Sequence, residues 1–291
     1  MNPTSTPILQ PGGPVPALRR IGLAAAAALY DELALAPKPG LVSFVDQGSH
    51  RDMDADTFLR SLHALRPYFE EMAVLGWRRE PFETLQACGI AAEARMLAAT
   101  GGVNTHRGAI FSLGLLCAAA GAALEASPRR RLAPQWIRDR LMLHWGEALE
   151  TRSHRASGLP GGIVARRHGL RSASMEAAAG FPTLFDTTWP ALDTGLRKGI
   201  GADRARLDAL FHAMAVLDDT NLVHRGGLAG LEYARHAARS FIADGGAGRP
   251  QGLAAAWALH QAFVARHLSP GGAADTLAAA CLLQRLQGSK A

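Results

Sequence analysis

The chain has 291 residues, a formal net charge of +6 and 48% hydrophobic residues, which excludes an intrinsically disordered protein and allows one large domain with a substantial core. Only 6% of residues are aromatic and alanine is abundant, a bias that favours helix over strand. The three cysteines lie far apart without a CxxC pair, which argues against a disulfide framework or zinc site and indicates buried thiols in a reducing compartment. The excess charge is nearly all arginine, which suits anionic partners but is also what a biased genomic base composition would give.

Taken in chain order, apolar periodicity interrupted by Gly/Pro loops predicts a succession of helices. Residues 1–15 are Pro/Gly-rich, lack the charged and apolar regions of a signal peptide, and are expected to form a flexible leader. Helices are expected at about 16–36, 56–76, 81–99, 105–124, 134–150, 173–180, 203–221, 227–243, 250–268 and 273–288.

Strand signals are weak throughout the sequence. The segment "GGIVARRHG" (161–169) is the best strand candidate, although it could equally be loop or helix. No apolar run is expected to reach the ~18 residues that suggest a membrane span. The sequence therefore predicts one compact all-α domain over residues 16–291, in a soluble, cytoplasmic protein without a membrane partner.

The loop "APKPGLVSFVDQGSHRDMDADTF" (36–58) combines prolines, a lysine and many acids. Pro37 and Pro39 end the first helix and hold Lys38 on a constrained turn, where it could meet a phosphate. The D-x-D-x-D run is not an EF-hand, because the required glycine and glutamate are missing.

Within that loop, the acidic residues admit two interpretations. One is that Asp54 or Asp56 caps the helix beginning near Thr57, and this interpretation is favoured for Asp56. The other applies to His50, Asp52 and Asp54, because carboxylates packed together repel unless a cation or a shared proton lies between them. Mg²⁺, held by one or two carboxylates and substrate phosphates, is the natural candidate.

The segment "TGGVNTHRGAIFSLGLLCAAAG" (100–121) reads as a buried helix with a polar opening. Asn104 or Thr105 is expected to cap it, and the preceding glycines to end the helix before it. A cap does not explain His106 and Arg107, since a cation in the first turn is disfavoured by the helix dipole. A phosphate bound at the helix start would explain them.

The segment "LDDTNLVHRGG" places Asp218 and Asn221 on one helix face, with Asp219 about 100° away. These acids either mark an exposed helix end or form a second acidic wall that completes a metal site or supplies a base. The segment also contains a second His-Arg pair, which ends at Arg225.

The segment "HLSPGGAADTLAAA" (267–280) looks like an ordinary helix opening. Ser269 and Pro270 form a standard start, and Asp275 in the first turn is favoured by the helix dipole. The chain has no Walker A, GxGxxG, GxSxG or HExxH motif. From the residues alone, the expected function is metal-assisted handling of a phosphorylated substrate.

The motifs "PKPGLV", "GSHRDMDADTF", "GGVNTHRGAIFSLGLL", "DDTNLVHRGG" and "LSPGGAADTLAA" occur in this order. Together they resemble the triphosphoribosyl-dephospho-CoA synthase family over roughly residues 20–288. The resemblance implies an enzyme that joins ATP to 3′-dephospho-CoA, giving 2′-(5″-triphosphoribosyl)-3′-dephospho-CoA and adenine. This product is the precursor of the prosthetic group on the acyl carrier subunits of citrate lyase and malonate decarboxylase. The stretch "ARRHGLRSASMEAAAGFPTLFD" is more similar to the malonate decarboxylase branch.

The implied reaction displaces adenine from the ribose C1′ of ATP by the 2′-hydroxyl of dephospho-CoA, through a transition state like an oxocarbenium ion. We assign roles by chemical type. Substrate and phosphate binding are assigned to Lys38, Asn104, His106, Arg107, Asn221 and Arg225. Magnesium binding is assigned to Asp52, Asp54, Asp218 and Asp219. Catalytic duty falls to Asp52 and Asp219 as base candidates and to His50 as acid candidate.

Three alternatives remain at this point. The chain could be a Mg²⁺-dependent N-glycosidase or ADP-ribosyl hydrolase, in which water replaces the ribose hydroxyl, or a synthase that serves citrate lyase. A nucleic-acid-binding module is disfavoured, because the arginines are scattered and aromatic residues are few. Alanine-rich helical faces make a homodimer possible.

Overall fold

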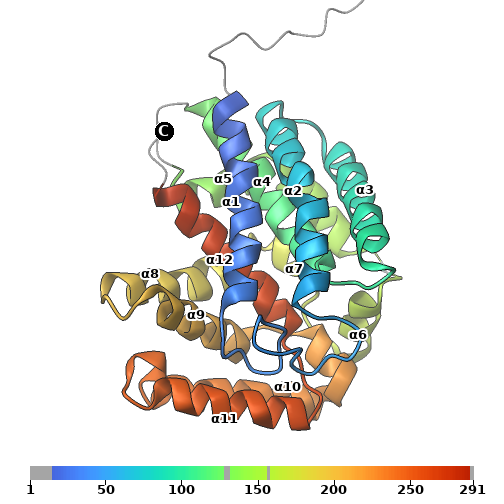
Figure 1. The fold of residues 1–291 in the computed structure, drawn as a ribbon. Coiled ribbons are helices and arrows are strands. Elements are labelled where there is room, and N and C mark those ends of the chain that lie inside the picture. Colours follow the sequence, from blue (N-terminus) through green and yellow to red (C-terminus); the bar gives the residue numbers. More distant parts are fainter. Residues whose placement is uncertain (1–14, 128–131, 156–157, 289–291) are drawn as a thin grey trace, which may run out of the picture.

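The computed structural model describes residues 15–127, 132–155 and 158–288, and in these ranges the chain is helical with no strand (Figure 1). The expected all-α fold is confirmed. The expected leader lies outside the described residues except for Val15, which begins the first helix. The helices are α1 (Val15–Ala34), α2 (Ala55–Trp77), α3 (Phe82–Thr100), α4 (Arg107–Ala126), α5 (Pro134–Ser153), α6 (Pro160–His168), α7 (Ala173–Ala178), the π-helix η1 (Thr183–Thr188), α8 (Trp189–Arg197), α9 (Ala202–Val216), α10 (Thr220–Ala243), the 3₁₀ helix η2 (Gly246–Gly248), α11 (Gly252–Ala265) and α12 (Gly271–Gly288).

The structure departs from the expected elements at several places, among them η1 and α8, which lie where no helix was expected. Residues 161–169 belong to α6 and its cap, not to a strand. The helix expected over 203–221 ends at Val216, because Asp219 caps a new helix through the backbone N–H of Asn221. That helix continues to Ala243 and is kinked at Gly227, where φ is 65° and ψ is −169°.

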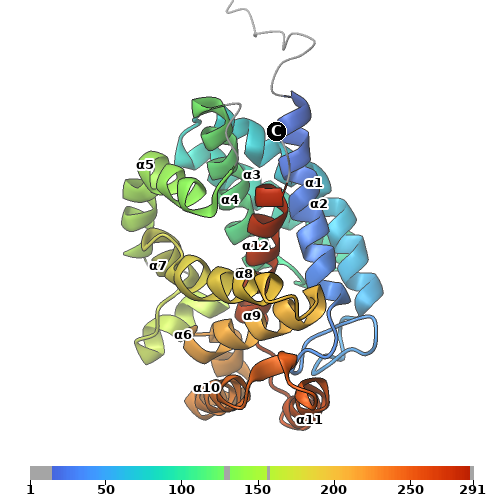
Figure 2. The same cartoon turned by 90° about the vertical axis from the view of Figure 1, so that its left-hand side faces the viewer.

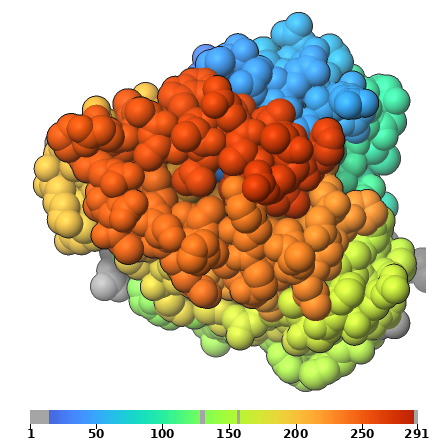
Figure 3. All heavy atoms as spheres, turned by 90° about the horizontal axis from the view of Figure 1, so that it is seen from below, coloured from blue at the N-terminus to red at the C-terminus, as the bar shows by residue number. Residues whose placement is uncertain are grey.

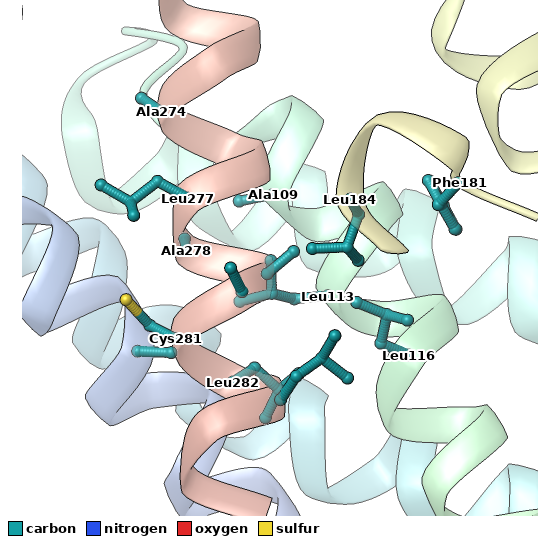
Figure 4. Packing of buried hydrophobic residues seen from close by; sticks show 14 of the residues in the cluster. Ala109, Leu113, Leu116, Phe181, Leu184, Ala274, Leu277, Ala278, Cys281 and Leu282 are labelled. Carbon is teal, nitrogen blue, oxygen red and sulfur yellow. The ribbon is translucent and has the colours of Figure 1, made fainter. Parts of the chain in front are cut away.

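Helices α4 and α12 form the centre of the core. In the close view, Leu282 of α12 lies on the side of that helix that faces Leu113 and Leu116 of α4, whereas Leu277 points to its other side (Figure 4). By length and composition α4 would also pass as a membrane span, contrary to the expectation that no run is long enough. However, 78% of its apolar window is buried against the rest of the protein, as in the core helix of a globular fold.

Glycines allow α2 and α4 to approach closely. A Cβ atom at Gly121 of α4 would lie 2.0 Å from the carbonyl oxygen of Ala73, and Gly76 of α2 meets the α4 backbone in the same way. Nearby, the hydroxyl of Tyr68 donates a hydrogen bond of 2.9 Å to the carbonyl oxygen of Ile110. The two helices are therefore packed backbone against backbone, which fixes the position of the α4 N-terminus.

A buried ion pair ties the first helix to the last. Asp31 of α1 is 7% exposed, and it accepts hydrogen bonds of 2.7 and 2.8 Å from the guanidinium of Arg285 on α12. Arg206 of α9 adds a third contact at 3.1 Å. This arrangement holds α1, α9 and α12 together.

Several helices begin in the lower part of the molecule (Figure 2). Seen at right angles, α1 to α5 form the upper part, α8 to α11 form the lower part, and α12 runs between them (Figure 2). Seen from below, α10 and α11 cross the face, with α6 at one side and the loop after α1 at the other (Figure 3).

Candidate active site

A cavity with a volume of about 1190 Å³ lies where α4, α6, α10 and α12 begin. Parts of α1, α2, α3 and the end of α5 complete its walls, together with the loop after α1. A typical pocket for one drug-sized ligand measures roughly 300–1,000 Å³. The cavity is therefore large enough for two substrates side by side.

Four helix N-termini face this cavity. Gly108 belongs to the first turn of α4, Gly161 to that of α6, Asn221 to that of α10 and Gly272 to that of α12, and all four residues line it. The first turn of a helix has N–H groups without intrahelical partners and the positive end of the helix dipole. Their convergence favours a ligand with several negative charges.

Charged side chains reinforce this preference. Among the described residues, the lining includes five arginines and three acids, namely Arg107, Arg152, Arg155, Arg166, Arg225, Glu32, Glu93 and Asp275. The arginines come from α4, α6 and α10 and from the end of α5 and the residues just after it, so positive charge is spread along the cavity. Of these, the sequence motifs singled out Arg107 and Arg225, whereas the other three follow no motif and were missed.

Arg225 is held in place before any ligand binds. Its Nη1 donates to the carbonyl oxygens of Ser49 at 3.1 Å and His267 at 3.3 Å, and its Nη2 donates to Nδ1 of His50 at 3.0 Å. His50 therefore carries its proton on Nε2, which lies 2.9 Å from the hydroxyl oxygen of Ser269. Burial, followed by the charge of Arg225, lowers the pKa of His50 to about 4. His50 thus helps to hold Arg225 in place, and its assignment as the catalytic acid stays a prediction.

At the start of α4, the side chain of Asn104 accepts a hydrogen bond of 3.1 Å from the backbone N–H of Arg107, as expected for a cap. The Arg107 guanidinium pairs with Glu93 of α3, with an Nε to Oε1 distance of 2.6 Å. All three residues line the cavity. The cation in the first turn is therefore balanced by an acid on the neighbouring helix, which the sequence pattern did not reveal.

His106 and Lys38 are buried. His106 is 4% exposed, and its Nδ1 lies 2.6 Å from the hydroxyl oxygen of Ser61. Burial, and secondarily the charge of Lys38, lowers the pKa of His106 to about 3. The Lys38 ammonium is 2.5 Å from both the backbone oxygen and Oε1 of Glu32, and burial lowers its pKa. Lys38 does not line the cavity, so its position offers no direct contact with a phosphate there.

Two of the four proposed magnesium ligands lie in the loop before α2. The Asp52 side chain is 63% exposed, with Oδ1 3.7 Å from Nδ1 of His50. Asp54 caps α2 by accepting hydrogen bonds from the backbone N–H and the hydroxyl of Thr57, at 2.9 and 2.7 Å. The cap is therefore Asp54, and the interpretation that favoured Asp56 for this role is wrong.

The other two aspartates lie between α9 and α10. Asp218 accepts a hydrogen bond of 2.7 Å from the backbone N–H of Arg171 and pairs with Arg235. Asp219 is 2% exposed and accepts from the backbone N–H groups of Asn221 at 3.0 Å and Ala273 at 3.1 Å. Asp219 thereby joins the starts of α10 and α12, and burial raises its pKa.

The predicted metal site is not assembled. Within residues 15–127, 132–155 and 158–288, no group of three or more His, Cys, Asp or Glu side chains is arranged to hold a metal ion. None of the four aspartates lines the cavity. These residues therefore do not form a preformed magnesium site.

One acid in the cavity was not recognised as functional from the sequence. Asp275 lines the cavity beside the start of α4, so close that a Cβ atom at Gly108 would lie 1.9 Å from its Oδ2. Burial, followed by the charges of Glu32 and Asp219, raises its pKa well above the ordinary value. The only signal in the sequence is an acid within the small-residue run "GGAAD", which equally fits a helix opening.

Comparisons with known proteins agree with the site. Residues 18–291 match the CitG family model, described as ATP:dephospho-CoA triphosphoribosyl transferase. An Azotobacter vinelandii protein named probable 2-(5''-triphosphoribosyl)-3'-dephosphocoenzyme-A synthase is 41% identical over 271 residues, which cover 90% of each chain. An Acinetobacter calcoaceticus protein of the same name is 38% identical, covering 92% of this chain and 91% of the relative.

A Klebsiella pneumoniae protein named 2-(5''-triphosphoribosyl)-3'-dephosphocoenzyme-A synthase is 39% identical over 260 residues, covering 86% of this chain and 85% of the relative. No solved structure is significantly similar to the chain. The family match spans nearly the whole sequence, including every helix that borders the cavity. The chain therefore belongs to the ATP:dephospho-CoA triphosphoribosyl transferase family, a family of transferase enzymes.

Proposed function

We propose that this enzyme transfers the triphosphoribosyl group of ATP to the 2′-hydroxyl of 3′-dephospho-CoA, giving 2′-(5″-triphosphoribosyl)-3′-dephospho-CoA and adenine. One observation supports this most directly. Four helix N-termini and five arginines face a single cavity of about 1190 Å³, an arrangement suited to a triphosphate and a diphosphate bound together. Family membership and the names of the relatives support the same reaction.

The chemistry needs no additional reactant. The 2′-hydroxyl oxygen forms a bond to C1′ of the ATP ribose while the bond from C1′ to the adenine nitrogen breaks. The electron pair of that bond leaves with adenine, which takes up one proton, and the attacking hydroxyl loses one. Anchored cations next to the phosphates keep both substrates aligned for this displacement, and Arg225, with its three fixed contacts, is the best placed for that role.

Magnesium is proposed as the companion of ATP. Mg²⁺ usually keeps several waters and binds through substrate phosphates plus one or two carboxylates, where it would neutralise phosphate charge. The contacts of Asp54, Asp218 and Asp219 support structural and positioning roles for these three carboxylates. Activity that requires Mg²⁺ in proportion to ATP, with no metal retained by the purified protein, is the expected result.

We also infer that the product serves the acyl carrier subunit of malonate decarboxylase, with citrate lyase as the alternative. This inference depends on the segment from Ala165 to Asp186, which forms the end of α6, α7 and η1 and contributes Arg166 and Ser172 to the cavity. A test is to supply the enzymatic product and the appropriate transferase to each carrier subunit and compare the yields of modified carrier.

The activity itself is tested by mass spectrometry of the protein incubated with Mg²⁺, ATP and dephospho-CoA, with each component omitted in turn. The transferase is supported by adenine and the triphosphoribosyl product appearing only in the complete mixture. Adenine release without dephospho-CoA would identify a hydrolase instead. A folded sample that releases no adenine in any mixture would contradict both functions.

A further inference from the structure

We propose that the cavity floor between α1 and α12 binds the adenine ring of ATP, and that Asp275 donates a proton to the departing base. This inference rests on the proposed function. It names the leaving-group subsite and a catalytic residue, for which the sequence had suggested other side chains.

The floor is apolar and rigid enough to hold a flat ring. It is formed by residues that line the cavity yet are at most 9% exposed, namely Leu29, Leu41, Val42, Ala274 and Ala278. These side chains come from α1, from the loop after it and from the first turns of α12. Such apolar side chains suit a purine ring, and Arg225, which contacts Ser49 and His50 in the same loop, lies close enough in the chain's fold to hold the phosphates of the same nucleotide.

The pairing of the cavity acids singles out Asp275. Glu93 is paired with Arg107 at 2.6 Å, and Glu32 is paired with Lys38 at 2.5 Å. In contrast, no lysine, arginine or histidine of the described ranges forms an ion pair with Asp275. Asp275 is half-buried, and a carboxyl group that is partly removed from water without a cation beside it takes up a proton more readily.

The surroundings of Asp275 favour the protonated form from more than one side. Glu32 of α1 and Asp219 at the start of α10 both raise its pKa through their negative charges, in addition to the effect of burial. A hydrogen bond from the backbone N–H of Ala109 at the start of α4 acts in the opposite direction and is the smallest of these influences. The acid is therefore held ready to donate where the apolar floor meets the α4 N-terminus.

Proton donation fits the chemistry of the leaving group. When the bond from C1′ to N9 breaks, its electron pair moves into the adenine ring, and the Asp275 proton passes to a ring nitrogen such as N7 or N3. The attacking 2′-hydroxyl loses its proton to solvent, and the Asp275 carboxylate regains one before the next turnover. Protons balance over the cycle, and no oxidant, reductant or further reactant takes part.

The test combines Asp275→Asn with ATP analogues in which N7 or N3 is replaced by CH. General acid catalysis typically contributes about 10²–10⁴-fold, so we expect Asp275→Asn to lower kcat by at least about 100-fold with ATP. The wild-type enzyme should lose a similar factor with the analogue that lacks the acceptor nitrogen. The variant should hardly distinguish that analogue from ATP, because the acid and its acceptor are two parts of one interaction.

Two outcomes would overturn the inference. One is a wild-type enzyme that uses ATP and both analogues equally well, and the other is a variant that discriminates between them as the wild type does. Asp275→Glu, which keeps an acid, should retain the discrimination and provides the same comparison if Asp275→Asn does not fold. Asp56→Asn, on an exposed residue outside the cavity, is the matched control.

The same experiment separates the two levels of the proposal. If the wild-type enzyme releases no adenine from ATP and dephospho-CoA, the proposed function fails. The enzyme could instead make the product while the decrease in kcat caused by Asp275→Asn and the decrease caused by the analogue are independent, so that their factors multiply. In that case only the assignment of Asp275 and of the adenine subsite fails.

Discussion

Gly108 and Asp275 come from distant parts of the chain and meet without room for a methyl group between them. A Cβ atom at position 108 would lie 1.9 Å from Oδ2 of Asp275, whereas non-bonded carbon atoms need about 3.5 Å. The glycine of "NTHRGA" is therefore explained by the aspartate of "GGAAD", and the two motifs form one wall of the cavity.

We predict that Gly108→Ala lowers kcat by at least about 10-fold, because the new methyl group displaces the Asp275 carboxyl from the cavity wall. The control is Gly89→Ala on α3, which also lines the cavity but where a Cβ atom would be 3.6 Å from the nearest atom. Steady-state kinetics of both variants check this. Equal activity of the two variants would contradict the importance of the contact.

Replacing Asp275 by asparagine should stabilise the protein in a pH-dependent way. The pKa of Asp275 is raised in the folded state, so the folded protein binds more protons than the unfolded chain, and stability is lost as pH rises above the unfolded pKa of about 3.9. Asparagine does not ionise, so the variant does not lose this stability as the pH rises. Its melting temperature should exceed that of the wild type near pH 7, and the difference should vanish below about pH 4. A difference that does not change with pH would refute the buried, proton-retaining carboxyl.

His106 should destabilise the protein in acid. Its pKa falls to about 3 in the folded state, so between about pH 6.5 and pH 3 the unfolded chain binds the proton and the folded chain does not. This reduces stability by at most about 1.4 kcal/mol for each pH unit. In urea unfolding experiments, the free energy of unfolding should decrease less steeply below pH 6.5 for His106→Asn than for the wild type. The exposed His63 on α2 provides the control, since His63→Asn should leave the slope unchanged.

Arg225→Lys should weaken substrate binding. Lysine cannot reproduce the fork of donors that reaches Ser49, His267 and His50 at once, so its charge is no longer fixed toward the cavity. We expect KM for ATP or for dephospho-CoA to rise by about 10-fold, with a smaller change in melting temperature than in KM. Arg60→Lys, on the exposed face of α2, should behave as the wild type. A change in stability with no change in either KM would assign Arg225 to the fold alone.

Asp31→Ala should destabilise the fold by about 3–5 kcal/mol, because it removes the buried carboxylate that Arg285 and Arg206 share. Asp203 also pairs with Arg206, but its side chain is 77% exposed, so Asp203→Ala should cost less than about 1 kcal/mol. Denaturant unfolding of the two variants measures both values. A small loss for Asp31→Ala would show that the pair adds little.

Most of the helices could be predicted, because a 3.6-residue apolar period and Gly/Pro breaks are local signals, but η1 and α8 were not expected. Partners across the fold could not. Asn104 was recognised as a cap from its neighbours, but Glu93 as the partner of Arg107 and Glu32 as the partner of Lys38 depend on how helices pack. The choice between Asp54 and Asp56 failed for a related reason, since both fit the local pattern and one hydrogen bond decides between them.

Asp275 shows the limit most clearly. The sequence suggests an acid in the first turn of a helix, where the dipole would favour it, but α12 begins at Gly271 and its first turn contains no acid, so Asp275 lies beyond the first turn. Its role becomes visible only when the starts of α4 and α12 are placed together, which local periodicity does not encode.

The pairing of Asp31 with Arg285 has a consequence for how the enzyme is made. The cavity floor consists of α1 and the start of α12, so it is built from the first and last described helices of the chain. During synthesis α1 is made long before α12, and the two helices can pack together only after the residues between them have been translated. Proteins that depend on such long-range contacts fold slowly. A nascent chain that stops before α12 has no floor to its cavity, so premature termination anywhere upstream yields a protein that cannot hold the nucleotide base.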